Sequence, residues 1–269
     1  MNHLLRELAP ISGEGWEAID QEASRTLRHF LAARKVVDFS GPHGWTHSAE
    51  TLGRVDPLGA APSAGVDAAI RQLQPLAELR TPFELSRREL EAIDRGSLDY
   101  DLQVVIDAAR QAAIAEDGAV FHGYDAAGIR GISESSPHAP VVIADNYNEY
   151  PGTVARAVAT LQAAGISGPF TIALGPRCYT GVIETTEHGG YPVLEHIRLI
   201  LGGPVVWAPG VDGAIVVSLR GGDFQLTCGQ DFSIGYVGHD ADSVRLYLEE
   251  SMTFRALSPE AGIALVYSD

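Results

Sequence analysis

Apolar residues near the start of the chain recur at spacings of three and four, the periodicity of an α-helix. The pattern covers residues 16–35 and includes Trp16, Ile19, Ala23, Leu27, Phe30 and Leu31. Ser12 is a suitable N-cap, and Arg34 and Lys35 place positive charge at the C-terminal end, where the helix dipole favours it. The sequence predicts a long amphipathic helix, packed on its own core or with one face left for a partner.

Residues 36–85 interrupt this periodicity with turn-forming residues. They include GPHGW (41–45), DPLG (56–59), AAPSAG (60–65) and TPFEL (81–85). At best a weak helix is indicated near residues 68–73. So long a stretch without packed elements is uncommon inside a compact domain, and we interpret it as a projecting β-ribbon arm.

The rest of the chain predicts helices in the middle and strands towards the end. Helical patterns cover residues 87–95, 101–116, 153–164, 176–187 and 193–201. Strand patterns cover residues 170–174, 215–219, 224–228, 232–236 and 244–256. In the last strand, one face carries Val244, Leu246, Leu248, Met252, Phe254 and Ala256. The predicted class is α+β, without an internal repeat.

Composition and charge narrow the class of protein. The chain has 269 residues, 45% of them apolar, which is enough to bury a core and excludes general disorder. Its 35 acidic residues against 19 basic ones give a net charge of −16, the wrong sign for gripping nucleic acid. The longest apolar stretch, near residues 199–211, is broken by Gly and Pro, so we expect no membrane span.

The N-terminal residues and the cysteines indicate where the protein resides. Arg6 and Glu7 precede any long apolar segment, so we expect no signal peptide. Cys178 and Cys228 do not have the spacing of a metal or redox motif. We therefore expect a reduced, cytoplasmic setting.

Sequence motifs for catalysis are missing. The chain contains no GxxxxGK[ST], GxGxxG or GxSxG segment. A Ser–His–Asp triad is not excluded by this, because its residues come together only in the folded structure. Two pairs have the spacing of metal ligands, His43 with His47 and Glu184 with His188. Pairs at this spacing are more often solvent-exposed surface residues than metal ligands. We expect a structural or binding protein rather than an enzyme, without a cofactor or metal.

Several segments, in order along essentially the whole chain, resemble the encapsulin shell proteins of the linocin/encapsulin family. They are RELAP (6–10), RKVVDFSGPHGW (34–45), PLAELR (75–80), ELEAIDRG (89–96), HGGYP (188–192), GGPVVWAP (202–209) and RGGDFQLTCGQDFSIGY (220–236). The last segment is the most specific, and the order of all of them carries more weight than any one.

The resemblance implies the tailed-phage (Hong Kong 97-like) major capsid fold. It divides the chain into an N-terminal helix (1–38), an extended loop arm (39–85), a peripheral domain with a spine helix (86–138), an axial domain (139–217) and a return to the peripheral domain (218–269). The elements predicted from periodicity agree with this division, with the spine helix at residues 101–116.

The resemblance also implies a function. Encapsulins are bacterial nanocompartments: the shell protein assembles with itself into a closed icosahedral homo-oligomer, in the smallest kind about 60 copies. The shell encloses a cargo enzyme, such as a dye-decolorizing peroxidase or a ferritin-like protein, which carries a C-terminal targeting peptide. No catalysis, nucleic acid or membrane is implied for the shell protein.

Two other functions compete with this one. A prophage capsid protein shares the fold, but a net charge of −16 suits DNA packing poorly. Lys35 is the only lysine, which disfavours the Lys–Asn bonds that covalently cross-link the subunits of some phage capsids. A hydrolase or a secreted bacteriocin-like protein would need a nucleophile constellation or an export signal, and the sequence indicates neither.

Two sites follow from the resemblance. We expect a cargo-peptide groove where the first helix meets a late strand, formed by Leu27, Phe30, Leu31, Arg34, Asp38, Phe232, Ile234, Tyr236 and Val237. The alternative is that Phe30 and Ile234 fill the core. We expect a fivefold pore lined by Thr186, Glu187, His188, Gly189, Gly190 and Tyr191, in which a histidine could sense pH. The alternative there is an ordinary surface loop.

Overall fold

The structure is a computed structural model that describes residues 3–144, 146–187 and 190–268. Its α-helices are α1 (Gly13–Phe30), α2 (Arg87–Asp94), α3 (Gln103–Phe121), α4 (Ile132–Ser135), α5 (Tyr150–Ala163), α6 (Pro176–Glu184) and α7 (Val193–Leu201). Its strands are β1 (Asp38–Ser40), β2 (Ala49–Pro57), β3 (Ala69–Pro75), β4 (Ala77–Ser86), β5 (Val141–Val142), β6 (Phe170–Leu174), β7 (Val205–Trp207), β8 (Ala214–Ser218), β9 (Phe224–Cys228), β10 (Ser233–His239), β11 (Ser243–Ala256) and β12 (Gly262–Val266).

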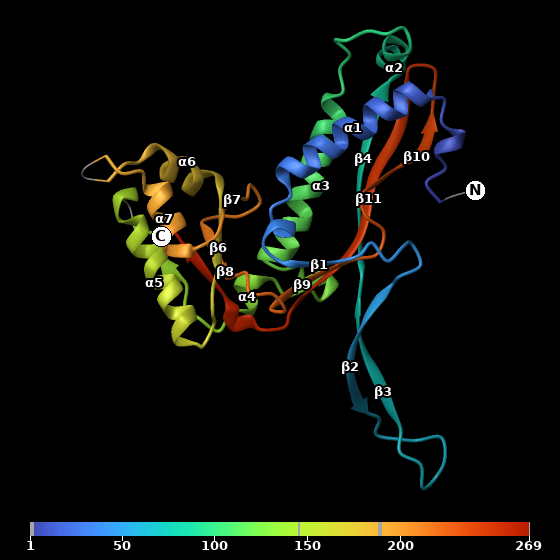
Figure 1. The fold of residues 1–269 in the computed structure, drawn as a ribbon. Helices are drawn as coiled ribbons and strands as arrows, with labels where there is room; N and C mark the ends of the chain where they lie inside the picture. Colours follow the sequence, from blue (N-terminus) through green and yellow to red (C-terminus); the bar gives the residue numbers. More distant parts are fainter. Residues whose placement is uncertain (1–2, 145, 188–189, 269) are drawn as a thin grey trace.

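The long strand β11 organises the larger part of the molecule (Figure 1). One of its edges pairs with β4, and the other pairs first with β10 and then with β9, all antiparallel. β1 adds to the far side of β9 as a parallel strand. Helices α1 and α3 pack over this sheet, and their apolar side chains form one core with Ile234, Leu246 and Leu248.

A second sheet, in the order β5-β12-β8-β6-β7, forms the smaller part together with α5, α6 and α7. Strands β6 and β8 are buried along their whole length, as expected for strands covered on both faces. Its core is continuous with the larger part through Phe121, Met252 and Phe254. β11 reaches this part through the short turn η5 (Pro259–Ala261) and β12, so the two sheets share one continuous segment.

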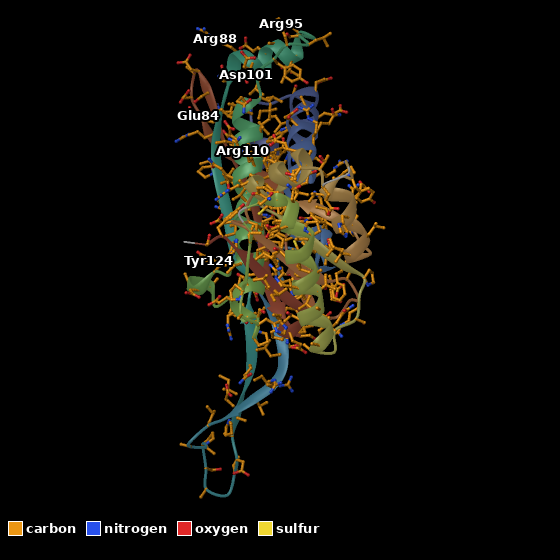
Figure 2. The ribbon with its side chains drawn as sticks, turned by 90° about the vertical axis from the view of Figure 1, so that its left-hand side faces the viewer. Glu84, Arg88, Arg95, Asp101, Arg110 and Tyr124 are labelled. Carbon is orange, nitrogen blue, oxygen red and sulfur yellow. The ribbon has the colours of Figure 1, made fainter. Side chains whose placement is uncertain are left out.

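The antiparallel hairpin β2–β3 projects away from both sheets, as the two views in Figures 1 and 2 show. Its apolar side chains Val55, Ile70 and Leu73 are more than half exposed. An isolated two-stranded hairpin is marginally stable in water, so this arm needs a surface outside the chain to cover it.

The structure confirms most of the predicted elements and corrects several. Ser12 is the N-cap of α1, because the Gly15 amide donates to its Oγ (2.9 Å). The weak helix expected near residues 68–73 is wrong, since β3 occupies that segment. Residues 77–85, the last part of the expected arm range, belong to β4, which pairs along β11. Helix α3 runs past Gly118 to Phe121, because the last three residues of the helix pack into the core.

Asp117 of α3 explains why α1 ends at Phe30 rather than at Lys35. Its buried carboxylate accepts hydrogen bonds from the backbone amides of Ala32 (3.0 Å) and Ala33 (2.8 Å). These bonds hold the chain in a sharp bend before a single 3-10 turn, η2 (Ala33–Lys35). Burial raises the pKa of Asp117 from its ordinary value of 3.8 to about 7, although the two amides act in the opposite direction.

This raised pKa predicts a pH dependence of stability. The protonated form is favoured in the folded chain, so the contribution of Asp117 is full below about pH 4 and is lost as the pH rises towards 7. Across that window the slope is roughly 1.4 kcal/mol per pH unit. Asp117→Asn keeps one oxygen for both amides and does not titrate. We expect the urea midpoint of the wild type to fall relative to this variant between pH 4 and 7; parallel midpoints would contradict the assignment.

Candidate functional site

Helix α1 and the start of β10 border a cavity of about 430 Å³, which we call the α1–β10 cavity. Among the residues expected to form a groove, those that line it are Leu27, Leu31, Arg34, Phe232 and Ile234. The structure thus brings together side chains about 200 positions apart in sequence, as a single concave surface of apolar floor and charged rim.

The other expected groove residues lie elsewhere. Phe30 packs beside Trp207, with ring centroids 5.3 Å apart, because α1 ends there and the chain bends. The Asp38 carboxylate accepts the Gly222 amide (2.5 Å), away from the cavity. The amide of Tyr236 donates to the carbonyl of Leu4 (2.8 Å). Val237 is 61% exposed at a register shift in β10 and does not line the cavity.

Residues that the sequence pattern did not single out complete the cavity wall. Ser24 and Arg28 lie one turn from Leu27 and Leu31 on α1, and the guanidinium of Arg28 donates to Ser24 Oγ (2.8 Å). A spacing of three residues from Leu27 could have identified Ser24, and the same spacing from Leu31 could have identified Arg28. The ion pair between Arg6 and Asp20 (2.7 Å) closes one end, and no local pattern connects these two residues.

Arg34 is the charged centre of this region. Its Nε donates to Glu116 (2.8 Å), one terminal nitrogen to Asp231 (2.8 Å), and the other to both Glu116 and Glu250. The rings of Phe39 and Phe232 flank the guanidinium, at 4.8 and 5.0 Å from its central carbon.

The pKa values of Arg34 and Glu250 are shifted by burial and by neighbouring charges. Burial opposes the charged guanidinium, but Glu116, Asp231 and Glu250 outweigh it and raise the pKa of Arg34. Burial, followed by the neighbouring carboxylate of Glu116, raises the pKa of Glu250 well above its ordinary value. One cation therefore serves three carboxylates, and Glu250 keeps its proton to a higher pH than an exposed glutamate.

The expected pore loop connects α6 and α7. His188 and Gly189 lie outside the described residues. Glu187 donates its amide to the Tyr191 carbonyl (2.8 Å), and Gly190, with φ of 82°, donates to the Glu187 carbonyl (2.9 Å). The positive φ of Gly190 is one that glycine adopts at low cost.

One histidine of α7 was not assigned to the loop by sequence. Nδ1 of His196 lies 2.6 Å from a carboxylate oxygen of Glu187, and its ring meets the edge of Tyr191. Glu187 thus has a hydrogen-bond partner one helical turn into α7.

The histidine pair considered for a metal has other partners. His43 lies 2.9 Å from Ser40 Oγ, and His47 lies 2.9 Å from Glu50. The pair of Glu184 and His188 falls partly outside the described residues. Within the ranges that the structure describes, no helix is long and apolar enough to cross a membrane.

A spine helix, two sheets and a projecting hairpin together make up the fold seen in capsid proteins. The virus-like particle from Pyrococcus furiosus has this fold, with a TM-score of 0.67 over 92% of this chain and 98% of that chain at 17% identity. The capsid of an empty GTA particle gives a TM-score of 0.55 at 15% identity, covering 89% and 90% of the two chains. The predicted α+β, Hong Kong 97-like capsid fold is confirmed.

Sequence comparison identifies the family within that fold. A family model described as "Encapsulating protein for peroxidase" matches residues 1–253. The chain is 54% identical to the type 1 encapsulin shell protein of Rhodospirillum rubrum, over 98% of this chain and 96% of the relative. It is 45% identical to that of Rhodococcus erythropolis, over 98% and 100%. The chain belongs to the encapsulin shell protein family.

Proposed function

We propose that this chain assembles in the bacterial cytoplasm into a closed icosahedral shell of about 60 copies that encloses a cargo enzyme. The observation that carries the proposal is the β2–β3 arm, whose apolar side chains are uncovered in the single chain. A neighbouring subunit of a capsid wall supplies the missing surface. The role is structural rather than catalytic, which accords with relatives that are named shell proteins.

Assembly predicts a specific sensitivity of the arm. In Ile70→Asp/Leu73→Asp, the two changes fall on exposed positions, so the fold of the chain survives, but each buries a charge at the contact with a neighbour. We expect the wild type to elute at megadalton size and to show closed particles in electron micrographs, and the variant to elute as small species.

The matched control is Ile70→Val/Leu73→Val, which keeps both positions apolar and should still form shells. Closed particles from the double aspartate variant, in wild-type yield, would contradict the role of the arm. A wild-type protein that stays a small oligomer at micromolar concentration would contradict the proposed function itself.

The α1–β10 cavity is our candidate for docking the cargo's targeting peptide. Leu27 and Leu31 line it, and Ile234, which is only 3% exposed, forms part of its floor while belonging to the core. Burying two or three small apolar side chains at about 1.5–3 kcal/mol each leaves only micromolar affinity after the ordering costs. Many copies on one shell raise the effective affinity of an oligomeric cargo.

Filling the cavity tests this docking without disturbing the core. Ser24 lines the cavity, whereas the neighbouring Arg25 has a side chain that is 75% exposed and does not line it. We expect Ser24→Trp shells, co-expressed with a peroxidase or ferritin-like cargo that carries its targeting peptide, to hold at least about tenfold less cargo per shell. Arg25→Trp shells should load normally. Undiminished loading in intact Ser24→Trp shells would exclude this cavity.

We also propose that the turn at residues 186–191 lines a fivefold pore, where one Glu187 from each copy forms a ring of negative charge. Charged rings select permeating ions by sign. Glu187→Gln removes that charge from the ring, and Glu184→Gln removes the same charge from the exposed end of α6.

Permeation by charged substrates tests the pore. We expect Glu187→Gln shells to slow a cationic substrate several-fold and to speed an anionic one, as judged by turnover of encapsulated against free peroxidase. Glu184→Gln shells should behave as the wild type. If Glu187→Gln and Glu184→Gln shells turn over each substrate at equal rates, Glu187 does not line the pore.

A further inference from the structure

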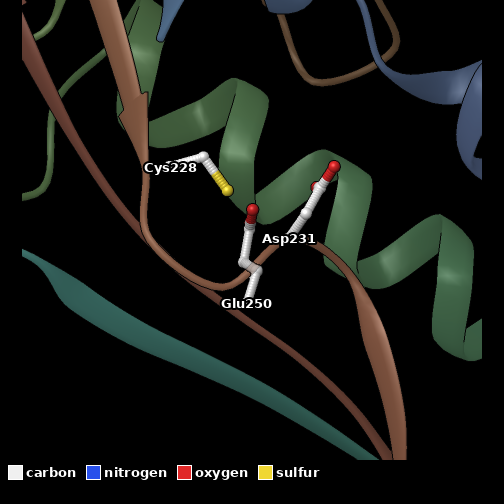
Figure 3. A group of neighbouring side chains, drawn as sticks. All are labelled: Cys228, Asp231 and Glu250. Carbon is white, nitrogen blue, oxygen red and sulfur yellow. The ribbon is translucent and has the colours of Figure 1, made fainter. Parts of the chain in front are cut away.

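Cys228, Asp231 and Glu250 converge beneath the α1–β10 cavity (Figure 3). They come from the end of β9, from the loop before β10, and from β11. One donor atom from each, the Cys228 sulfur and a carboxylate oxygen from the other two, lies within 4.8 Å of both others. Cys228 and Glu250 are buried, and the side chain of Asp231 is 39% exposed.

Arg34 leaves part of each carboxylate free. It binds one oxygen of Glu250 (Oε2, 3.3 Å) and one of Asp231 (Oδ1, 2.8 Å), which also accepts the Phe232 amide. The other oxygen of Glu250, Oε1, is buried and has no hydrogen-bond partner among the described residues. A buried carboxylate oxygen without a partner is costly, and Figure 3 shows this carboxylate directed towards the sulfur of Cys228.

Positive charge is in short supply around these atoms. With Glu116, Asp231 and Glu250 ionised, Arg34 alone leaves the group with two uncompensated negative charges. Burial raises the pKa of the Cys228 thiol, and the carboxylates of Asp231 and Glu250 raise it further. The cluster thus retains protons, and a divalent cation could take their place.

We propose that Cys228, Asp231 and Glu250 bind one borderline-soft divalent cation of the Zn²⁺ type. A thiolate with two carboxylate oxygens suits Zn²⁺, whereas Mg²⁺ and Ca²⁺ favour sites built from oxygen alone. Zinc bonds of about 2.0–2.3 Å require the three donors to draw closer, to roughly 3.3–3.8 Å apart. The partly exposed Asp231 side chain provides this freedom, and water from the cavity completes the coordination.

The route and the proton balance follow from the same contacts. Arg34 and Asp231 both line the α1–β10 cavity, so the cation reaches the donors from there. Binding forms a metal–sulfur bond and two metal–oxygen bonds, and it releases the thiol proton of Cys228, and any proton held by Glu250, to solvent. Affinity therefore rises with pH. The bound cation links β9, the loop before β10, and β11, independently of any cargo.

Cobalt titration of the assembled shell tests the site directly. Co²⁺ bound to a thiolate gives a sulfur-to-metal charge-transfer absorption, which Zn²⁺ abolishes by displacement. In shells first stripped with a chelator, we expect a saturable band at one Co²⁺ per chain, with tighter binding at pH 8 than at pH 6. A wild-type shell without the band at pH 8 would overturn the proposal.

The second cysteine gives a matched control. Cys178 is also buried, but its sulfur lies beside the hydroxyl of Tyr267 (2.9 Å) in the smaller part of the molecule. We expect Cys228→Ser to lose the band and Cys178→Ser to keep it; the reverse result would overturn the site.

Asp231→Asn covers the case in which Cys228→Ser does not fold. Its side chain is partly exposed, so the fold should tolerate the change, and we expect Co²⁺ affinity to fall about tenfold or more. Unchanged affinity in this variant would exclude Asp231 as a ligand and, with it, the proposed site.

Discussion

The buried ion group around Arg34 is the interaction on which the rest of the structure depends. Arg34 binds Glu116, Asp231 and Glu250, which follow it by 82, 197 and 216 positions in the chain. Breaking a buried ion pair typically costs about 3–5 kcal/mol, so the contacts of Arg34 with the buried Glu116 and Glu250 cannot be lost without penalty, whereas the partly exposed Asp231 contributes less. The group fixes the end of α1 relative to α3, β11 and the loop before β10, and with it the walls of the α1–β10 cavity.

Asp117 stabilises the same bend after α1 by binding the backbone of the bend rather than a side chain. Arg34 is held by its side-chain charge, whereas Ala32 and Ala33 just before it are held by their backbone amides. Two adjacent acidic residues on α3, Glu116 and Asp117, thus secure one bend. Both are buried, and each has partners that compensate its burial: Arg34 for Glu116, and the backbone amides of Ala32 and Ala33 for Asp117.

Local patterns predicted those elements whose limits are set locally. Residues 170–174, 193–201 and 224–228 form β6, α7 and β9 with the expected limits. The end of α1 escaped prediction because Asp117, far away in sequence, determines it. β4 escaped because Pro82 and Thr81 indicate a turn; proline is tolerated in β4 because it is an edge strand, paired only with β11 in the described ranges.

In the candidate site, too, local patterns predicted the residues of regular elements but not the contacts between distant segments. Leu27, Leu31 and Ile234 were identified by periodicity, and they do lie together in the cavity. Arg34 also lines the cavity, whereas its partners Glu116 and Glu250 do not line it and carry no local sequence signal, because each is a carboxylate buried within a mostly apolar element. Val237, expected at the end of the strand, lies at a register shift in β10 and outside the cavity lining.

The pairing of early with late segments has a consequence for how the chain is made. β1 needs β9, β4 needs β11, and the carbonyl of Leu4 needs the amide of Tyr236. While the ribosome is still adding residues before β11, the larger sheet has no central strand to form around. Domains generally fold as units during synthesis. A nascent chain therefore carries its arm before the larger sheet can form, and it becomes competent to join other copies only after β11 has been synthesised.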